Sequence, residues 1–422
     1  MGKTKDKLTK LELSWILYDV GNSAFTMIAC SLIPIWFKEL ARFAGDEAYA
    51  HATSNWAYVT AIVTVIVAIV GPICGTITDN KGLKKPIFTA SLVIGLLSCV
   101  MLGFINSWTG YLLVFIIAKV AYSSSLTFYD SMLTDVTTPE RSDWVSSYGF
   151  AWGYIGSCLP FAVALVFYMA GAGMLGSFVV SESTARVVGC TATAVWWLLV
   201  TLPLLKNYKQ KYYVVPQKGA VKEAFSRLGR TLKKIALEDK KVLWFLLAFF
   251  LYIDGVNTII DNCINIGTDL ALDTVGQVVF LLATQVVAFV FSLIFSKLSK
   301  KYRTVSLIKV CICGYFCVCI YALFLKNLTQ FAIMAFGVGM FQGSIQALSR
   351  SYFSKIIPAE NSGEYFGLYD IFAKGAACLG SLVLGIVKDV TGSIQIAVGC
   401  MALFFALGFI FLRKADSIAN EE

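Results

Sequence analysis

Two stretches of otherwise apolar sequence carry the same short pattern of polar residues. Each pattern sets a carboxylate, an amide, a hydroxyl and a further polar group at i, i+3, i+4 and i+7, positions that share one face of an α-helix. The two patterns are Asp19, Asn22, Ser23 and Thr26, and Asp254, Asn257, Thr258 and Asp261. A carboxylate in an apolar setting can bind an amino group or carry a proton, because removal from water favours the neutral acid. Both patterns therefore predict a polar lining for a solute site.

The depth of the two leading carboxylates differs by direct count. Asp254 follows Val242 by twelve residues, or about 18 Å of helix, which predicts a position near the middle of a membrane. Asp19 follows Trp15 by only four residues, and tryptophan prefers the membrane–water interface, so Asp19 alone could reach water by extending its side chain. The repeat favours a place for Asp19 opposite Asp254.

Further ionisable residues interrupt apolar runs, where a charge costs a few kcal/mol and so suggests a function. Lys119 lies in the middle of one run and has no acidic residue one helical turn away, which favours a role as ligand for a carboxylate. Asp370 and Lys374 are four residues apart, so they could bind a solute or simply neutralise each other.

Two glutamines and one further charge pair add to this set. Gln342 and Gln346 share a helix face and could donate hydrogen bonds to a solute, although the adjacent Gly343 would also suit close packing. Asp130 and Arg350 fall near the ends of two apolar runs. They fit charges at a gate between helices and equally fit side chains that extend to the membrane surface.

Carboxylates on two helices and a lysine on a third suit a zwitterion. Its amine would meet Asp19 or Asp254, with Asn22 and Asn257 beside them, and its carboxylate would meet Lys119. We assign proton coupling to Asp254 and Asp261, because Asp254 is the deeper carboxylate and Asp261 adds a like charge two turns on. Sodium remains open as the coupling ion. A sugar would require more Asn, Gln and Trp in the site.

The elements that position these residues must cross a membrane. Charged residues make up 14% of 422, hydrophobic residues 58%, and mean hydropathy is +0.73, whereas soluble domains are about 25% charged. Apolar runs near 20 residues predict twelve spanning helices. The predicted spans are 14–37, 56–78, 86–106, 111–133, 145–169, 187–205, 242–266, 275–296, 305–325, 329–352, 365–387 and 393–412.

The distribution of basic residues predicts the orientation of these spans. Of 35 Lys and Arg, 27 fall on the side of both termini, 5 on the opposite side and 3 within helices, which predicts cytoplasmic termini. We expect a six-helix bundle at 1–205, a basic linker at 206–241 and a second bundle with a short tail at 242–422. The linker supplies most of the +9 net charge, so this charge indicates contact with the lipid surface and no nucleic-acid partner.

Other classes of protein are disfavoured by what the chain lacks. His51 is the single histidine and lies outside the predicted spans, which excludes histidine-based catalytic triads and zinc sites within the membrane. The sequence contains no G-x-x-x-x-G-K-[ST] loop for a nucleotide phosphate. Most of the twelve cysteines lie within apolar runs, as small packing residues do. We expect no enzyme activity, metal or cofactor.

A loop after the second predicted span carries the most specific motif. It runs from Gly75 through Asp79 and Gly82 to Lys84 and Lys85. It resembles the loop signature G-x-x-x-D-[RK]-x-G-[RK]-[RK] of the major facilitator superfamily, and departs from it at positions 80 and 83. The resemblance implies that Asp79 latches the outward-facing state against the eleventh helix, while the two lysines hold the loop. An ordinary charged turn would also account for these residues.

Three further segments narrow the resemblance to one branch of that superfamily. The stretches 14–25, 251–258 and 342–351 are similar to the vacuolar amino-acid effluxer-like family, related to the autophagy-linked effluxers. The resemblance implies an all-α membrane protein with two pseudo-symmetric six-helix bundles. It also implies a secondary active transporter that exports amino acids. The charged residues described above extend the expected solute to a similar zwitterion and add proton coupling. We expect a monomer in a plasma membrane. A sensor or scaffold without flux, or a transporter of sugars or other organic solutes, remains the alternative.

Overall fold

The first part of the chain folds into nine helices. The computed structural model describes residues 7–215, 220–262, 266–267 and 274–421, and within these ranges it contains no β-strand. The helices are α1 (Lys10–Cys30), α2 (Leu32–Ala44), α3 (Asp46–Ala50), α4 (Ala52–Thr78), α5 (Lys84–Phe104), α6 (Trp108–Ser131), α7 (Leu133–Val136), α8 (Pro139–Gly171) and α9 (Glu182–Asn207).

The second part of the chain adds a linker helix and a second group of helices. These are α10 (Ala220–Leu237), α11 (Lys240–Asp261), α13 (Thr274–Leu298), α14 (Thr304–Ala322), α15 (Leu328–Ile356), the short 3₁₀ helix η1 (Ala359–Asn361), α16 (Ser362–Thr391), α17 (Ile394–Cys400) and α18 (Ala402–Glu421). One hydrophobic core lies among α1–α9, and a separate one lies among the helices from α10 onward. The division at 205 and 241 remains a prediction.

The spanning helices agree with the sequence prediction. Eleven helical segments of the described ranges are long and apolar enough to cross a membrane. The eighth predicted span, 275–296, coincides with α13, and the apolar stretch described there is the shorter Leu282–Leu298. The prediction of a twelve-helix, all-α membrane protein is confirmed.

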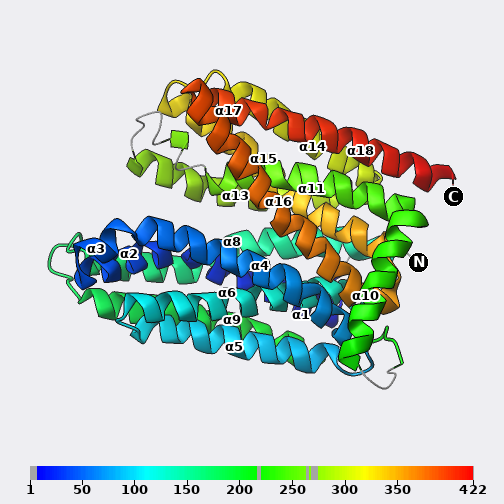
Figure 1. The fold of residues 1–422 in the computed structure, drawn as a ribbon, viewed down its shortest axis with the longest axis horizontal. Helices are drawn as coiled ribbons and strands as arrows, with labels where there is room; N and C mark the ends of the chain where they lie inside the picture. Colours follow the sequence, from blue (N-terminus) through cyan, green and yellow to red (C-terminus); the bar gives the residue numbers. More distant parts are fainter. Residues whose placement is uncertain (1–6, 216–219, 263–265, 268–273, 422) are drawn as a thin grey trace.

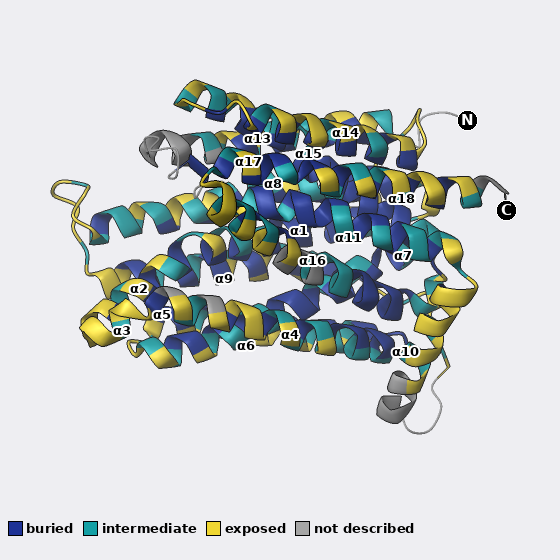
Figure 2. Ribbon diagram, turned by 45° about the horizontal axis from the view of Figure 1, so that its top comes forward, coloured by how far each residue is buried: buried dark blue, intermediate teal, exposed yellow. Residues whose placement is uncertain are grey.

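The helices form two groups that lie side by side along their length, α1–α9 in one and α11–α18 in the other (Figure 1). The groups meet where α4 packs against α16 and where α8 packs against α13 and α15. Figure 2 shows buried residues concentrated on α1 and α11, while exposed residues follow the outer faces. Large apolar side chains such as Leu97 and Leu113 are exposed there, as expected where lipid replaces water.

The start of α1, the end of α18 and the linker helix α10 all lie at one end of the molecule, which we call the termini end (Figure 1). There, α1 begins with a capping box, in which Thr9 and Glu12 bond each other's backbone N–H groups. Asp19 therefore lies nine residues into the helix, about 13 Å from its start. Trp15 is fully buried among protein side chains, so its preference for the membrane interface is no guide to the depth of Asp19.

Candidate transport site and gate

The predicted site residues of α1 are buried and already hydrogen-bonded. Asp19 Oδ2 accepts a hydrogen bond of 3.0 Å from Arg350 Nη2, and Asn22 Nδ2 donates to Asp19 Oδ1 at 3.3 Å. Asp19 is 6% and Asn22 3% exposed. This carboxylate therefore reaches no solute in the closed arrangement described here, because an arginine from the other helix group occupies it.

Arg350 ties the two helix groups together at the termini end. From α15 it reaches Asp130 on α6, with 2.9 Å between Nη1 and Oδ1, and its Nε donates to Ser146 Oγ on α8 at 3.0 Å. Arg350 is 2% exposed. The sequence left two interpretations of Asp130 and Arg350. In the structure they are charges at an interface between helices and do not extend to the membrane surface.

Aromatic rings enclose the same guanidinium. Its Cζ lies 4.6 Å from the ring centre of Trp15, 5.5 Å from that of Tyr129 and 4.4 Å from that of Phe150, within cation–π range. Trp15 and Tyr129 stack at 4.4 Å, and the Trp15 indole N–H donates to the Tyr129 carbonyl at 3.0 Å. We call the two carboxylates and three rings the cation cage. Its members are Trp15, Asp19, Tyr129, Asp130 and Phe150.

Asp254 on α11 has a different environment from Asp19. It is fully buried, and its Oδ1 accepts from the Gly380 N–H at 3.0 Å and from Thr258 Oγ1 at 3.4 Å. Its Oδ2 is buried without a hydrogen-bond partner in the described part of the chain. A Cβ on Gly380 would lie 2.6 Å from Asp254 Oδ1, so glycine permits this approach of α16. A buried carboxyl oxygen without a partner is costly unless it holds a proton or a cation.

Lys119 and Asp261 lie in different helix groups, on α6 and at the end of α11. Lys119 is partly buried, its Nζ lies 5.3 Å from the Tyr122 ring centre, and Asp261 is exposed at the end of α11. Lys374 forms an ion pair with Asp370 and donates to Ser123 Oγ. The charges of Asp370 and Lys374 therefore neutralise each other, which was one of the two interpretations of their spacing. The role of Lys119 as ligand for a solute carboxylate stays a prediction.

Apart from Asn22 on α1, the amide side chains of the predicted site lie on α11 and α15. Asn257 and Gln346 are partly buried, and Gln342 is 4% exposed. A Cβ on Gly343 would lie 2.3 Å from Ser292 Oγ, so this glycine is needed where α15 passes α13. Close packing thus explains the glycine, and the glutamines keep their predicted role as proposals.

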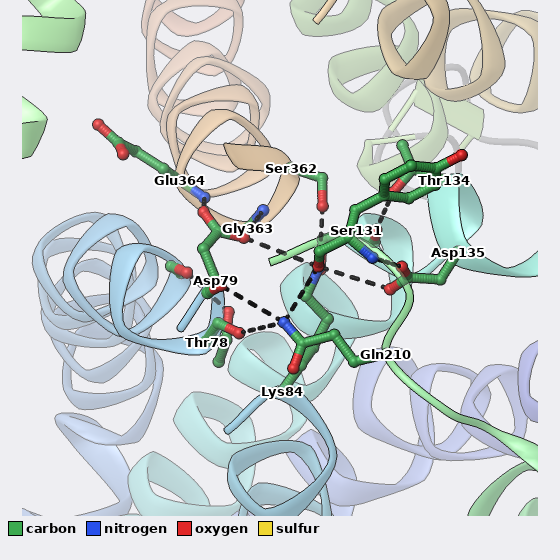
Figure 3. A network of polar contacts seen from close by, with 12 residues as sticks. Thr78, Asp79, Lys84, Ser131, Thr134, Asp135, Gln210, Ser362, Gly363 and Glu364 are labelled. Carbon is green, nitrogen blue, oxygen red and sulfur yellow. Dashed lines mark hydrogen bonds and ion pairs between the residues drawn. The ribbon is translucent and has the colours of Figure 1, made fainter. Parts of the chain in front are cut away.

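The loop between α4 and α5 joins the start of α16 through Asp79. Asp79 Oδ1 accepts from the Gly363 N–H at 2.7 Å, and Oδ2 accepts from the Glu364 N–H at 2.9 Å (Figure 3). The first N–H groups of a helix lack partners within that helix and carry its positive dipole end, so a carboxylate is stabilised there. The contact is that expected from the motif: the fourth helix along the chain is tied to α16 in the other group.

Lys84 completes this contact. Its Nζ lies 3.7 Å from Asp79 and 3.7 Å from Asp135, and it donates to Ser362 Oγ at 2.8 Å. Lys84, Asp79 and Asp135 are each fully buried. Lys85 is only partly buried and, within the described residues, forms no ion pair. The two lysines of the motif thus differ in their surroundings.

Two glycines of the motif have separate steric reasons. A Cβ on Gly75 would lie 2.2 Å from the Gly363 carbonyl oxygen, so α4 and α16 can meet only over glycine. Gly82 has φ +78°, a conformation that favours glycine, and its N–H donates to Gln210 Oε1 at 2.9 Å. We call Gly75, Asp79, Gly82 and Lys84, together with Asp135 and their partners on α16, the latch.

The sequence analysis missed several members of the latch. Asp135 accepts from the Tyr208 hydroxyl at 2.5 Å and from the N–H groups of Lys211 and Tyr212, each at 2.9 Å. Glu364 is buried and pairs with Arg227 of α10 at 3.2 Å. The start of the basic linker therefore packs into the latch. A signal was present in Asp135 itself, an acidic residue that directly follows an apolar span.

Burial raises the pKa of Asp79 to about 7, while Lys84 and the two backbone N–H groups of α16 lower it. The charged form is thus held mainly by one buried ammonium and one helix start. In an arrangement open to water at the termini end, the group would return to the ordinary pKa of about 3.9 for an aspartate. The ionisation of Asp79 is therefore linked to whether this end is closed.

Sequence relatives cover nearly the whole chain. A family described as "Vacuole effluxer Atg22 like" matches residues 8–417. The uncharacterized MFS-type transporter YxiO of Bacillus subtilis (strain 168) is 39% identical over 410 residues, 96% of this chain and 95% of that protein. Autophagy-related protein 22 of Botryotinia fuckeliana (strain B05.10) is 26% identical over 321 residues, 68% of this chain and 52% of that protein.

Solved structures agree on the fold. The human organic anion transporter MFSD10 (TETRAN) superposes with a TM-score of 0.72 at 14% identity, over 95% of this chain and 98% of that one. The fucose:proton symporter FucP of E. coli gives 0.69 at 15% identity, over 96% and 97%. With the fold shared by these transporters and the family match spanning almost every residue, this chain belongs to the vacuole effluxer Atg22 like family of MFS-type transporters.

Proposed function

We propose that this transporter moves an amino acid or a similar zwitterion across a plasma membrane by alternating access, in the direction of export and coupled to protons. The observation that carries the substrate class is the set of buried or partly buried charges on three helices: Asp19, Asp254 and Lys119. Two carboxylates and one ammonium match the two ends of a zwitterion and leave one carboxylate for a proton.

The contacts between the helix groups support an assignment of the conformation. Arg350 and the latch both close the termini end. With the termini in the cytoplasm, as the basic residues favour, this closed end makes the arrangement outward-facing. The two groups would then rock about the site between them, with the termini end opening in the inward-facing state.

Flux measured in proteoliposomes tests this function. Vesicles preloaded with radiolabelled amino acids should release them faster when an imposed pH gradient lets protons move the opposite way, and dissipating the gradient with a protonophore should slow release. A sodium gradient of the same size should have no such effect. Binding of amino acids without flux under any gradient would indicate a sensor, and flux of sugars alone would indicate another substrate class.

Replacing Lys84 with methionine should open the termini end at pH 8. Both Asp79 and Asp135 would lose their buried counter-ion, and breaking a buried ion pair costs about 3–5 kcal/mol, a shift of more than a hundredfold in the conformational equilibrium. The measurement is the alkylation rate of a cysteine at Ala347, which is buried against α8 in the closed arrangement, in a background without the native cysteines.

The sign of the pH effect follows from Asp79. Lys84 lowers the pKa of Asp79, so its removal lets burial raise that pKa above about 7. At pH 6 the proton then replaces the lost ammonium, and the closed arrangement should recover. Lys85→Met is the matched control and should label like the parent chain at both pH values. Equal labelling of Lys84→Met and the parent at pH 8 would leave the latch as an ordinary charged turn.

A further inference from the structure

All five members of the cation cage come from one helix group, whereas the cation inside comes from the other. The rings and carboxylates lie on α1, α6 and α8, and Arg350 lies on α15. If the groups separate at the termini end, the cage moves with the first group and the guanidinium moves with the second. The cage would then be open and without its cation.

The cage is held by contacts that do not involve Arg350. Trp15 stacks on Tyr129 and bonds its carbonyl, and the ring of Tyr18 packs on Tyr129 with 4.5 Å between ring centres. Space for the cation comes from Gly149 of α8, where a Cβ would lie 2.4 Å from Asp19 Oδ2 and 3.2 Å from Arg350 Nη2. The geometry that receives a guanidinium is therefore built into the first helix group.

An emptied cage would leave two carboxylates facing three aromatic rings. Among the described residues, Arg350 is the one cation within ion-pair distance of Asp19 and Asp130. Uncompensated charges in such surroundings are costly, so a replacement cation would be favoured. The rings select its type. Aromatic faces attract weakly hydrated organic cations, as guanidinium is, more readily than a compact, strongly hydrated ion.

We propose that the cation cage is a binding site for the ammonium or guanidinium group of an organic solute, which Arg350 fills only while the termini end is closed. The inference rests on the proposed transport function and deepens it, because it assigns the amine of the solute to this cage. Arg350 then acts as a tethered competitor. Solute and Arg350 compete for the cage, so closure of the termini end displaces the cationic group of the solute from the cage toward the site between the two helix groups.

Removing the tethered competitor tests the site directly. Purified Arg350→Ala should bind guanidinium chloride at low millimolar concentration, seen as a rise in melting temperature relative to equal sodium chloride. The parent chain should show no rise, because its cage is occupied. Arg350→Ala combined with Asp19→Asn should bind guanidinium at least tenfold more weakly. Arg303→Ala is the matched control. It removes an exposed ion-pair partner of Asp416 and should gain no guanidinium binding.

A second measurement covers the case in which Arg350→Ala does not fold. In the chain with a single cysteine at Ala347, methylguanidinium at a concentration well above that which binds Arg350→Ala should raise the alkylation rate by competing with Arg350. Tetramethylammonium, which cannot donate hydrogen bonds to Asp19, should raise it less. Absence of guanidinium binding by folded Arg350→Ala, or no effect of methylguanidinium on labelling, overturns the proposal. Guanidinium binding without amino-acid flux would support the cage as a binding site and contradict the proposed transport function. Amino-acid flux without guanidinium binding would support the transport function and contradict the cage.

Discussion

Replacing Asp254 with asparagine should abolish transport driven by a pH gradient while leaving the exchange of bound solute intact. The carboxyl group is fully buried, and its Oδ2 has no partner in the described residues, so it is best placed to hold a proton. Asparagine keeps an oxygen that can accept from the Gly380 N–H, so packing of α11 on α16 should survive. Exchange moves no net proton and therefore needs no titrating group.

The measurement compares two assays on the same proteoliposomes: uptake driven by an imposed pH gradient, and counterflow with unlabelled solute at equal pH. Asp416→Asn is the matched control. It neutralises another carboxylate that is mostly buried, but one already paired with Arg303 and Lys309, so gradient-driven uptake should persist. Gradient-driven uptake by Asp254→Asn at the parent rate would show that Asp254 does not carry the coupling proton. Loss of both gradient-driven uptake and counterflow would mean that Asp254 is needed for the structure of the protein and not specifically for coupling.

The spanning helices could be predicted because apolar run length is a local property of the sequence. The depth of Asp19 could not, because it depends on where α1 begins. Trp15 suggested an interface, while the capping box of Thr9 and Glu12 places the start one and a half turns earlier, and Trp15 is buried in the cation cage. A tryptophan is a reliable depth marker only when its ring has no partner within the protein.

Ion pairs between residues close in the sequence could be predicted, whereas those between distant residues could not. The Asp370–Lys374 pair was visible as an i, i+4 spacing, and the structure contains it. Arg350 reaches Asp19 and Asp130, which are hundreds of residues away in the chain, and no spacing rule connects them. The latch illustrates the same limit. Its motif named Asp79, but Asp135 enters through the packing of other segments.

Asp19→Asn and Lys119→Ala should each weaken solute binding by about ten- to a hundredfold. A hydrogen bond to a charged group contributes about 1.5–3 kcal/mol, which corresponds to that range of affinity. Unlike Asp254→Asn, both variants should lose counterflow in proportion to binding, since the solute itself is held less well. Calorimetric titration with the amino acid that gives the highest flux provides the measurement.

Analogues of the solute separate recognition from the other roles of these side chains. Asp19 also pairs with Arg350, so its neutralisation alters the closed arrangement as well as the site. An analogue without the amino group should bind the parent weakly and lose nothing further in Asp19→Asn, and an analogue with an amide in place of the carboxylate should behave likewise in Lys119→Ala. Such non-additivity arises only if each side chain meets the missing group. Parent-like affinity in both variants would mean that the charges serve only one another, and that a zwitterion is not the solute.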